Sequence, residues 1–167
     1  MEILIPGLIL VGLMVYASTK IKKSAAAAYD EEKIEAPDFS ITKPEGFISP
    51  VDDSGFAFVA HSRDFGIDEA DNIRQVSAEL RILEDKTLDG VRSEISSEAS
   101  KVGNEQRLAG GFVLETEEII NGVVVEREHH VYERDGRIYA LTVEMLPEYK
   151  AEQQKNIDTL IASFDVK

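Results

Sequence analysis

The sequence predicts an α+β fold, an antiparallel sheet packed by two amphipathic helices and preceded by one N-terminal transmembrane helix. Three observations carry this prediction. Residues 112–146 alternate apolar and polar side chains in three runs that form a C-terminal three-strand meander, joined by turn-forming residues. Residues 87–103 and the segment after Pro147 repeat apolar side chains at helical spacing. Residues 3–17 contain no charged side chain.

The first turn of the meander is set by the dipeptide Asn121-Gly122. Asparagine and glycine both tolerate positive φ angles, so this pair favours a two-residue type I′ hairpin. Such a turn places Ile120 opposite Val123. The whole pairing of the first two strands then follows from that register.

The second turn, at residues 134–136, allows two readings. A two-residue loop sets the apolar side chains of the third strand beside glutamates, whereas a three-residue loop with a bulge at Gly136 slips the pairing by one residue. We adopt the three-residue loop, because it gathers the apolar side chains on one face. That face then holds Phe112, Leu114, Val123, Val125, His129, Val131, Tyr139, Leu141, Val143 and Met145.

The remaining elements follow from periodicity. Strands are predicted at residues 39–41, 55–60 and 76–83, of which the last alternates cleanly. A helix is predicted over residues 87–103, with Gly103 as its C-terminal stop. A second helix begins at Pro147, and its apolar stripe consists of Tyr149, Ile157, Leu160, Ile161 and Phe164.

The apolar N-terminal run predicts a membrane anchor in residues 1–23. Ser18 and Thr19 extend the uncharged run to residues 3–19. A helix over these residues reaches roughly 25 Å, slightly less than the ~30 Å hydrocarbon thickness, and flanking lysines can reach the interface. A cleaved signal peptide is the alternative, but it carries its positive charge before the apolar run. The anchor residues are Ile3, Leu8, Leu10, Val11, Leu13, Met14 and Val15, with Lys20, Lys22 and Lys23 as the basic flank.

The basic flank also predicts orientation. Because positive charge is retained on the cytoplasmic side, the three lysines place the C-terminal domain in the cytoplasm, with an extracytoplasmic location as the alternative. Residues 24–38 are predicted to form a helical stalk and linker, ended by Pro37. Residues 39–167 then form the folded acidic domain.

Charge limits the partners that this domain can have. The chain carries a net charge of −14, and from residue 24 onward 15 Lys and Arg face 31 Asp and Glu, a net −16. Such a surface repels nucleic-acid phosphate and favours basic protein partners, so no nucleic acid is expected. The chain has no cysteine, which excludes disulfides, zinc–thiolate sites and cysteine nucleophiles.

The predicted register produces a candidate binding site on the other face of the meander. Glu117 lies opposite Glu126, which lies opposite Glu144, and Glu115 and Glu128 form the next row. Like charges opposed across strands are destabilising, so the rows indicate a compensating cation or a basic protein partner. We favour the partner, because no tight loop concentrates oxygen ligands as a calcium site requires. The alternative is a solvated strand face, or carboxylates covered by lysines and arginines from a neighbouring helix.

Two adjacent histidines, His129 and His130, point to opposite faces of their strand and therefore cannot hold one metal ion together. His129 is predicted to be a buried histidine bonded to a nearby group, and His130 to join the acidic face. No nucleophile elbow, Walker loop or dinucleotide fingerprint is present, so we expect no catalytic residue, cofactor or metal site.

Residues 39–47 (FSITKPEGF), residues 136–139 (GRIY), and Tyr149, Ile157 and residues 161–164 (IASF) resemble the PsbP-like fold family. That family includes photosystem II extrinsic proteins and a small Ran-binding factor. The resemblance covers residues 39–167, and none of its motifs is chemically specific. It implies an α/β/α sandwich that acts as a non-catalytic docking or assembly module, with no shared catalytic residues. The membrane anchor departs from the family pattern.

Three functions are consistent with these features. The first is a membrane-anchored protein-binding or complex-assembly domain that uses its acidic face. The second is a carrier of a small apolar ligand or lipid, which needs a large apolar pocket between sheet and helices. The third is a hydrolase, which needs two carboxylates that converge in a cleft.

Overall fold

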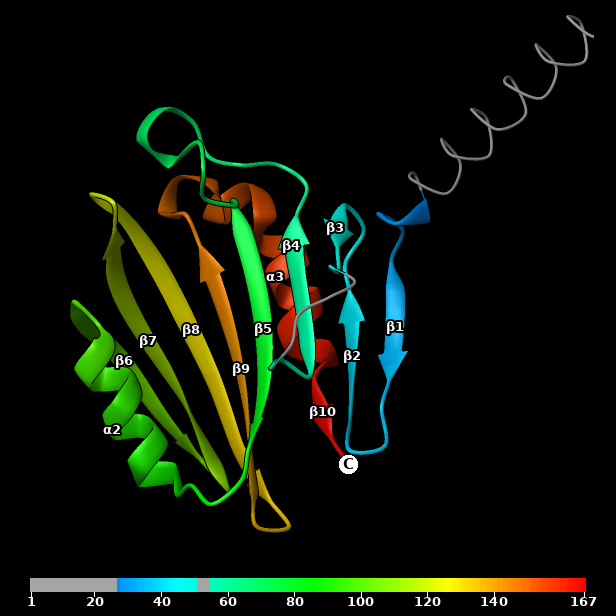
Figure 1. Ribbon diagram of the computed structural model, residues 1–167, viewed down its shortest axis with the longest axis vertical. Helices are drawn as coiled ribbons and strands as arrows, with labels where there is room; N and C mark the ends of the chain where they lie inside the picture. Colours follow the sequence, from blue (N-terminus) through cyan, green and yellow to red (C-terminus); the bar gives the residue numbers. More distant parts are fainter. Residues whose placement is uncertain (1–26, 51–54) are drawn as a thin grey trace, which may run out of the picture.

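The computed structural model describes residues 27–50 and 55–167. Its main sheet has seven antiparallel strands in the order β3-β4-β5-β9-β8-β7-β6, and a smaller sheet has the order β1-β2-β10 (Figure 1). The strands are β1 (Glu32–Glu35), β2 (Phe39–Lys43), β3 (Phe47–Ile48), β4 (Phe58–Ser62), β5 (Val76–Leu83), β6 (Lys101–Leu108), β7 (Gly111–Ile120), β8 (Val123–Arg134), β9 (Arg137–Met145) and β10 (Asp165–Val166). The helical segments are η1 (Asp68–Ala70), α2 (Leu88–Glu98), η2 (Pro147–Tyr149) and α3 (Lys150–Ser163).

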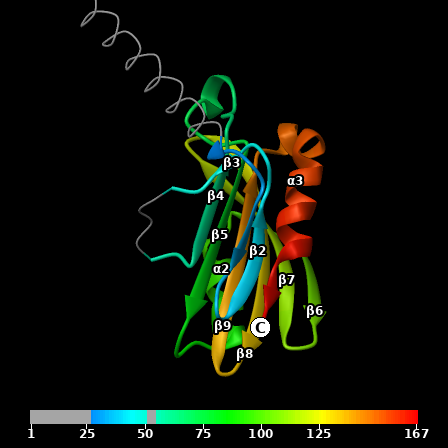
Figure 2. The same cartoon turned by 90° about the vertical axis from the view of Figure 1, so that its right-hand side faces the viewer.

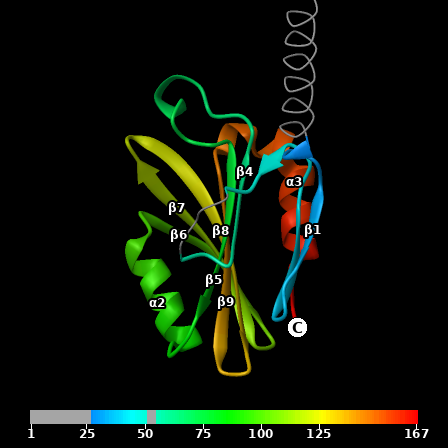
Figure 3. The same cartoon turned by 45° about the vertical axis from the view of Figure 1, so that its right-hand side comes forward.

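The two helices lie on opposite faces of the main sheet (Figures 1 and 2). Helix α2 packs against β7 and β8, near one edge. Helix α3 packs on the other face, together with the small sheet, against β4, β5 and β9 (Figure 3). The main sheet is therefore covered on both faces, but over different strands.

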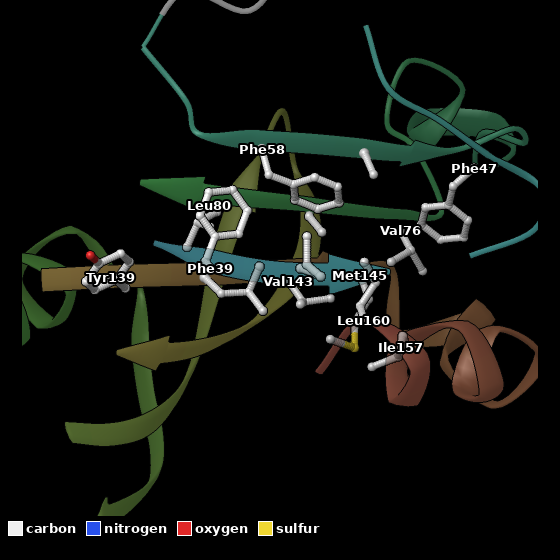
Figure 4. Close-up of a cluster of buried hydrophobic side chains, with 14 residues drawn as sticks. Phe39, Phe47, Phe58, Val76, Leu80, Tyr139, Val143, Met145, Ile157 and Leu160 are labelled. Atoms are coloured by element: carbon white, nitrogen blue, oxygen red, sulfur yellow. The ribbon is translucent and has the colours of Figure 1, made fainter. Parts of the chain in front are cut away.

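The larger core lies between the main sheet, α3 and the small sheet. Met145 of β9 lies near Ile157 and Leu160 of α3, and Phe39 of β2 lies over the middle of the sheet (Figure 4). Burial of these side chains supplies most of the driving force for docking α3 and the small sheet. The fully enclosed members of this core include Ile41, Ala60, Val76, Ala78, Leu80, Leu141, Val143 and Leu160.

A second core lies beneath α2. Val91 is the buried residue of this helix, and it packs against Phe112 and Leu114 of β7 and Val131 of β8. Thr87 caps the N-terminus of the helix, because its side chain accepts a hydrogen bond from the Gly90 backbone N–H at 3.1 Å.

Most predicted elements are confirmed. Strands β2 and β5 cover the predicted residues, and α3 follows Pro147 after one turn of η2. Strand β4 overlaps the strand predicted at residues 55–60 but begins at Phe58 and ends at Ser62. The first hairpin turn is also as predicted, because Asn121 and Gly122 have φ angles of 52° and 87° and Ile120 pairs with Val123.

The predicted helix over residues 87–103 is too long. Helix α2 ends at Glu98, and Ala99 is already extended with φ −71° and ψ 141°. Residues that seemed to continue the helical stripe, such as Val102, belong to the edge strand β6, which the sequence did not predict. An edge strand buries little, so it lacks the clear alternation of an interior strand.

The predicted helical stalk over residues 24–38 is also wrong where the structure describes it. Residues Glu32–Glu35 form β1, which pairs antiparallel with β2 through contacts such as Ile34 with Ile41. The folded domain therefore begins before Phe39. The two-residue strands β3 and β10 were not predicted either, because so short a segment has no readable period.

The predicted three-residue loop between the second and third meander strands is wrong. Asp135 and Gly136 form a two-residue turn with φ angles of 52° and 74°, and Arg134 pairs with Arg137. As a result, the buried β9 residues Tyr139, Leu141, Val143 and Met145 share a face with Glu126 and Glu128 of β8. The prediction failed because it assumed one apolar face, whereas each face is covered over different strands.

The predicted membrane anchor, residues 3–17 with its lysine flank, lies outside the described residues. Within residues 27–50 and 55–167, no helix is both long enough and apolar enough to cross a membrane.

Candidate functional site

Four glutamates of β7 and β8 share the α3 face of the main sheet. Glu117 pairs with Glu126 and Glu115 with Glu128, as the first hairpin turn predicts. Together with Gly103, Met145 and Lys150 they line a hollow of about 130 Å³. We call Glu115, Glu117, Glu126 and Glu128 the acidic face.

Glu144 does not belong to this face. The prediction placed it opposite Glu126, but the two-residue turn pairs Glu126 with Met145 and Glu144 with Arg127. Glu144 therefore points to the α2 side, where its Oε1 lies 2.5 Å from an Arg127 guanidinium nitrogen. The same guanidinium also forms an ion pair with Glu118, so Arg127 is held between two carboxylates.

Two lysines offset part of the negative charge of the acidic face. Lys150, the first residue of α3, donates to Glu126 at 2.7 Å, and Lys101, the first residue of β6, donates to Glu117 at 2.5 Å. The hydrogen bond to Glu126 raises the pKa of Lys150, and the bond to Glu117 raises the pKa of Lys101. Both pairs are largely solvent-exposed, so each contributes little to stability.

The second pair of the acidic face, Glu115 and Glu128, has different contacts. His130 Nε2 lies 2.7 Å from Glu128 Oε1, so His130 joins this face as the sequence predicts. The hydrogen bond to His130 lowers the pKa of the Glu128 carboxyl against the opposing effect of burial, and Glu128 therefore stays ionised. Glu115 is exposed.

The acidic face keeps a net negative charge after these contacts. It holds two more carboxylates than lysines, and these four strand side chains are fixed in register on a rigid sheet. Such an arrangement can accept lysine or arginine side chains from another molecule, because exposed carboxylates retain unused acceptor positions.

The opposite side of β8 has a structural role. His129 is almost fully buried, with Nε2 at 3.0 Å from Thr116 Oγ1 and Nδ1 at 3.0 Å from Thr142 Oγ1. Burial lowers the pKa of His129 to about 4, and the nearby charges of Arg127 and His130 act in the same direction. His129 is therefore neutral near pH 7, which confirms the prediction of a buried, bonded histidine.

The sequence did not predict that Lys101 and Lys150 contact the acidic face. Lys150 could have been found from the expected helix start after Pro147, which places a basic residue beside the end of the third meander strand. Lys101 had no such signal, because residue 101 was assigned to a helix rather than to the strand beside β7.

The described residues also bear on metal binding and on acid catalysis. Within them, no three His, Asp or Glu side chains are placed to hold a metal ion together. The paired glutamates lie side by side on a sheet, and the hydrogen bond to His130 lowers the pKa of Glu128. A catalytic acid in such a pair has a raised pKa.

Comparison with known proteins identifies the fold. No protein-family model matches the chain, and no curated protein matches it in sequence. The solution structure of cyanobacterial PsbP (CyanoP) from Synechocystis sp. PCC 6803 superposes with a TM-score of 0.56 at 16% identity, covering 83% of this chain and 94% of that one. The domain has a PsbP-like fold. The resemblance predicted from the sequence is thereby confirmed at the level of fold.

Two further PsbP-like structures support this assignment. The Saccharomyces cerevisiae Ran-binding protein Mog1p has a TM-score of 0.55 at 15% identity, with 83% of this chain and 96% of that chain covered. LpqN from Mycobacterium tuberculosis, involved in cell envelope biogenesis, has a TM-score of 0.52 at 14% identity, covering 83% and 91%. At these identities the similarity establishes the fold alone.

Proposed function

We propose that this protein is a membrane-tethered, non-catalytic binding domain whose acidic face holds a basic segment of a protein partner. The observation that carries the proposal is the charge left on that face. Lys101 and Lys150 offset two of its four carboxylates. Of the other two, Glu115 is exposed, and Glu128, on the adjacent strand, is partly exposed and hydrogen-bonded to His130. Fixed, uncompensated charge favours association with oppositely charged surfaces and speeds encounter.

The fold supports a binding role. Mog1p, which has the same PsbP-like fold, is a Ran-binding protein, so the fold is used for protein recognition in at least one neighbour. The partner of this chain is proposed by chemistry alone. It is a protein that presents several lysine or arginine side chains on one surface.

The tether is proposed from the sequence. Residues 3–17 are uncharged and long enough to enter a bilayer, and Lys20, Lys22 and Lys23 follow them. We propose a single-pass anchor with the acidic domain on the cytoplasmic side, as the positive-inside rule favours.

Partner capture tests the acidic face. The full chain, in detergent-solubilised membranes from its own source, is expected to capture a lysine-rich partner at low salt. The double variant Glu117→Gln/Glu126→Gln is expected to lose most of that capture, because it removes half of the carboxylates while keeping the side-chain shape. The readout is the amount of each captured protein as salt is raised, since contacts between exposed charges weaken with ionic strength.

The matched control is Glu98→Gln/Glu152→Gln, which removes the same charge from exposed positions on α2 and α3. The proposal requires that the control retain the partner. If both double variants retain the partner equally, the acidic face does not bind it. If both lose the partner equally, binding depends on net charge alone.

Protease protection tests the orientation. Sealed inside-out vesicles carrying the full chain should expose the acidic domain to added protease, so that only the N-terminal segment survives. If the domain stays intact until detergent is added, it lies on the extracytoplasmic side.

Neither alternative function is favoured by an observation. The space between the main sheet and α3 is filled by buried side chains such as Phe39, Val143 and Leu160, where a lipid carrier needs a large apolar pocket. The hollow beside α3 is lined mainly by charged residues. A hydrolase would need converging carboxylates with a raised pKa, and the acidic face has Glu128 with a lowered one.

A further inference from the structure

The described chain begins at one end of the domain. Lys43 Nζ donates to the Ala28 carbonyl at 2.7 Å, and the Gly46 backbone N–H donates to the Tyr29 carbonyl at 2.7 Å. The Arg63 guanidinium lies 5.9 Å from the centre of the Tyr29 ring. The entry of the chain is therefore fixed beside the end of β4, where the loop towards η1 starts (Figure 1).

The same end of the domain carries exposed apolar side chains from two separate segments. Ile67 precedes η1 and is 68% exposed, while Ile119 and Val124 flank the β7–β8 turn and are 60% and 42% exposed. Ile119 and Val124 pair directly across the hairpin. The η1 loop and the β7–β8 turn lie at the end where the chain enters, opposite the β6–β7 and β8–β9 turns (Figures 1 and 3).

These segments are packed together rather than independent. Ala70 of η1 belongs to a buried cluster with Val125 and Leu146, against which Ile120 and Val123 also pack. Ile67, Ala70 and Val123 line one open hollow. Val123 and Val124 point to opposite faces of β8, so Ile67 lies on the face of Val123, and Ile119 and Val124 lie on the face of the glutamates. Isolated exposed apolar residues are ordinary, but these three border the same end of the hairpin from both faces.

Chain length ties this end to the predicted anchor. Only residues 24–26 separate Lys23, the end of the basic flank, from Ala27, the first described residue. Four Cα-to-Cα steps span at most about 14 Å even when fully extended. If the lysines lie at the membrane interface, Ala27 must lie within that distance of it, and the domain cannot turn its entry end far from the bilayer.

We infer that this end is the bilayer-facing end of the domain, and that Ile67, Ile119 and Val124 rest in the headgroup region of the membrane. The inference rests on the membrane tether of the proposed function and adds a second, weaker contact to it. Three apolar side chains that insert only partly into a membrane bind it weakly on their own. The anchor holds them at a high effective concentration, which is enough to fix the tilt of the domain.

The charges beside these residues select the lipid. Asp68, Glu69 and Glu148 line the same hollow as Ile67 and would be repelled by anionic headgroups. The surface therefore fits a zwitterionic bilayer, whose ammonium groups can lie next to these carboxylates. This orientation also keeps the acidic face, which continues along β7 and β8 from Ile119 and Val124, close to the membrane for a partner held there.

The absence of cysteine makes site-specific labelling direct. The full chain is placed in phosphatidylcholine vesicles as single variants Ile67→Cys, Ile119→Cys and Val124→Cys, each carrying an environment-sensitive fluorophore. Control labels at Glu84→Cys and Ala109→Cys lie in the β5–α2 and β6–β7 connections at the opposite end. The readouts are emission wavelength, quenching by nitroxide-bearing phosphatidylcholine, and co-flotation of protein with vesicles.

We expect a blue shift and strong lipid quenching at positions 67, 119 and 124, and neither effect at the two control positions. Replacing part of the lipid by phosphatidylglycerol should reduce the quenching. Co-flotation with no quenching at the three positions would overturn this inference and leave the tether intact. If the full chain does not co-float with vesicles, both this inference and the membrane tether are overturned. If the labels respond to a soluble basic protein and not to lipid, this end of the domain is a protein contact and the inference is overturned.

Discussion

Among single residues, His129 is the one whose surroundings make the clearest pH prediction. It is buried between Thr116 and Thr142, and its pKa is lowered to about 4 from an ordinary value near 6.5. Between these two values the unfolded chain binds a proton that the folded chain does not. Stability is therefore fully present above about pH 6.5 and is lost as the pH falls towards 4.

We expect His129 to account for a loss on the order of 3 kcal/mol in the free energy of unfolding between pH 6.5 and pH 4. The comparison is with His129→Gln, which keeps two hydrogen-bonding groups for the threonines but cannot titrate. Urea unfolding across this pH range should give a steeper loss for the natural chain. Parallel curves for the two proteins would show that His129 does not titrate as its burial implies.

Residue chemistry was partly predictable from the sequence. The opposite orientation of His129 and His130 follows from the two-residue period of a strand, and the structure confirms both positions. The lysines that meet the acidic face were not predictable, because Lys101 reaches Glu117 only across a strand pair whose existence the sequence did not indicate.

At the scale of elements, the sheet register depends on how closely two strands approach. Gly111 begins β7, and a Cβ atom added there would lie 2.1 Å from the Val131 carbonyl oxygen and 3.2 Å from Tyr132 Cα. Backbone cannot move aside as a flexible side chain can. Only glycine therefore allows β7 and β8 to pair in the observed register at this point.

We predict that Gly111→Ala destabilises the domain by roughly 2–4 kcal/mol, as expected when a close-packed contact is overfilled. Gly103→Ala is the matched control, since a Cβ there would meet Glu115 at 3.2–3.3 Å across an edge strand that can shift slightly. Its cost should stay below about 1 kcal/mol, because alanine is also the better strand residue. Equal effects in urea unfolding would contradict the described register.

Element boundaries show why sequence periodicity was only partly sufficient. The interior strand β5 alternates as predicted, since Val76, Ala78 and Leu80 are buried on one face. The edge strand β6 and the third meander strand were misread for different reasons. The side chains of β6 are largely exposed, so this strand has no apolar period. Both faces of the main sheet are covered, so the register that gathers apolar side chains of the third strand on one face was the wrong choice.

At the scale of the whole molecule, the distribution of charge connects fold to function. The part of the chain from residue 24 onward carries a net charge of −16, and four carboxylates are fixed together on β7 and β8 of its PsbP-like fold. The α+β class and the shared face of these four were predictable from local patterns. The position of Glu144 on the opposite face was not predictable, because the register of the third meander strand depends on one residue in the preceding turn.

Carboxyl-to-amine crosslinking in native membranes tests the central claim most directly. A carbodiimide joins carboxylates only to amines in contact with them, and the Glu126–Lys150 and Glu117–Lys101 pairs provide an internal reference. The account predicts that crosslinks to a partner's lysines concentrate on Glu115, Glu117, Glu126 and Glu128 and disappear at high salt. Partner crosslinks confined to other carboxylates, such as those of α2, would contradict it.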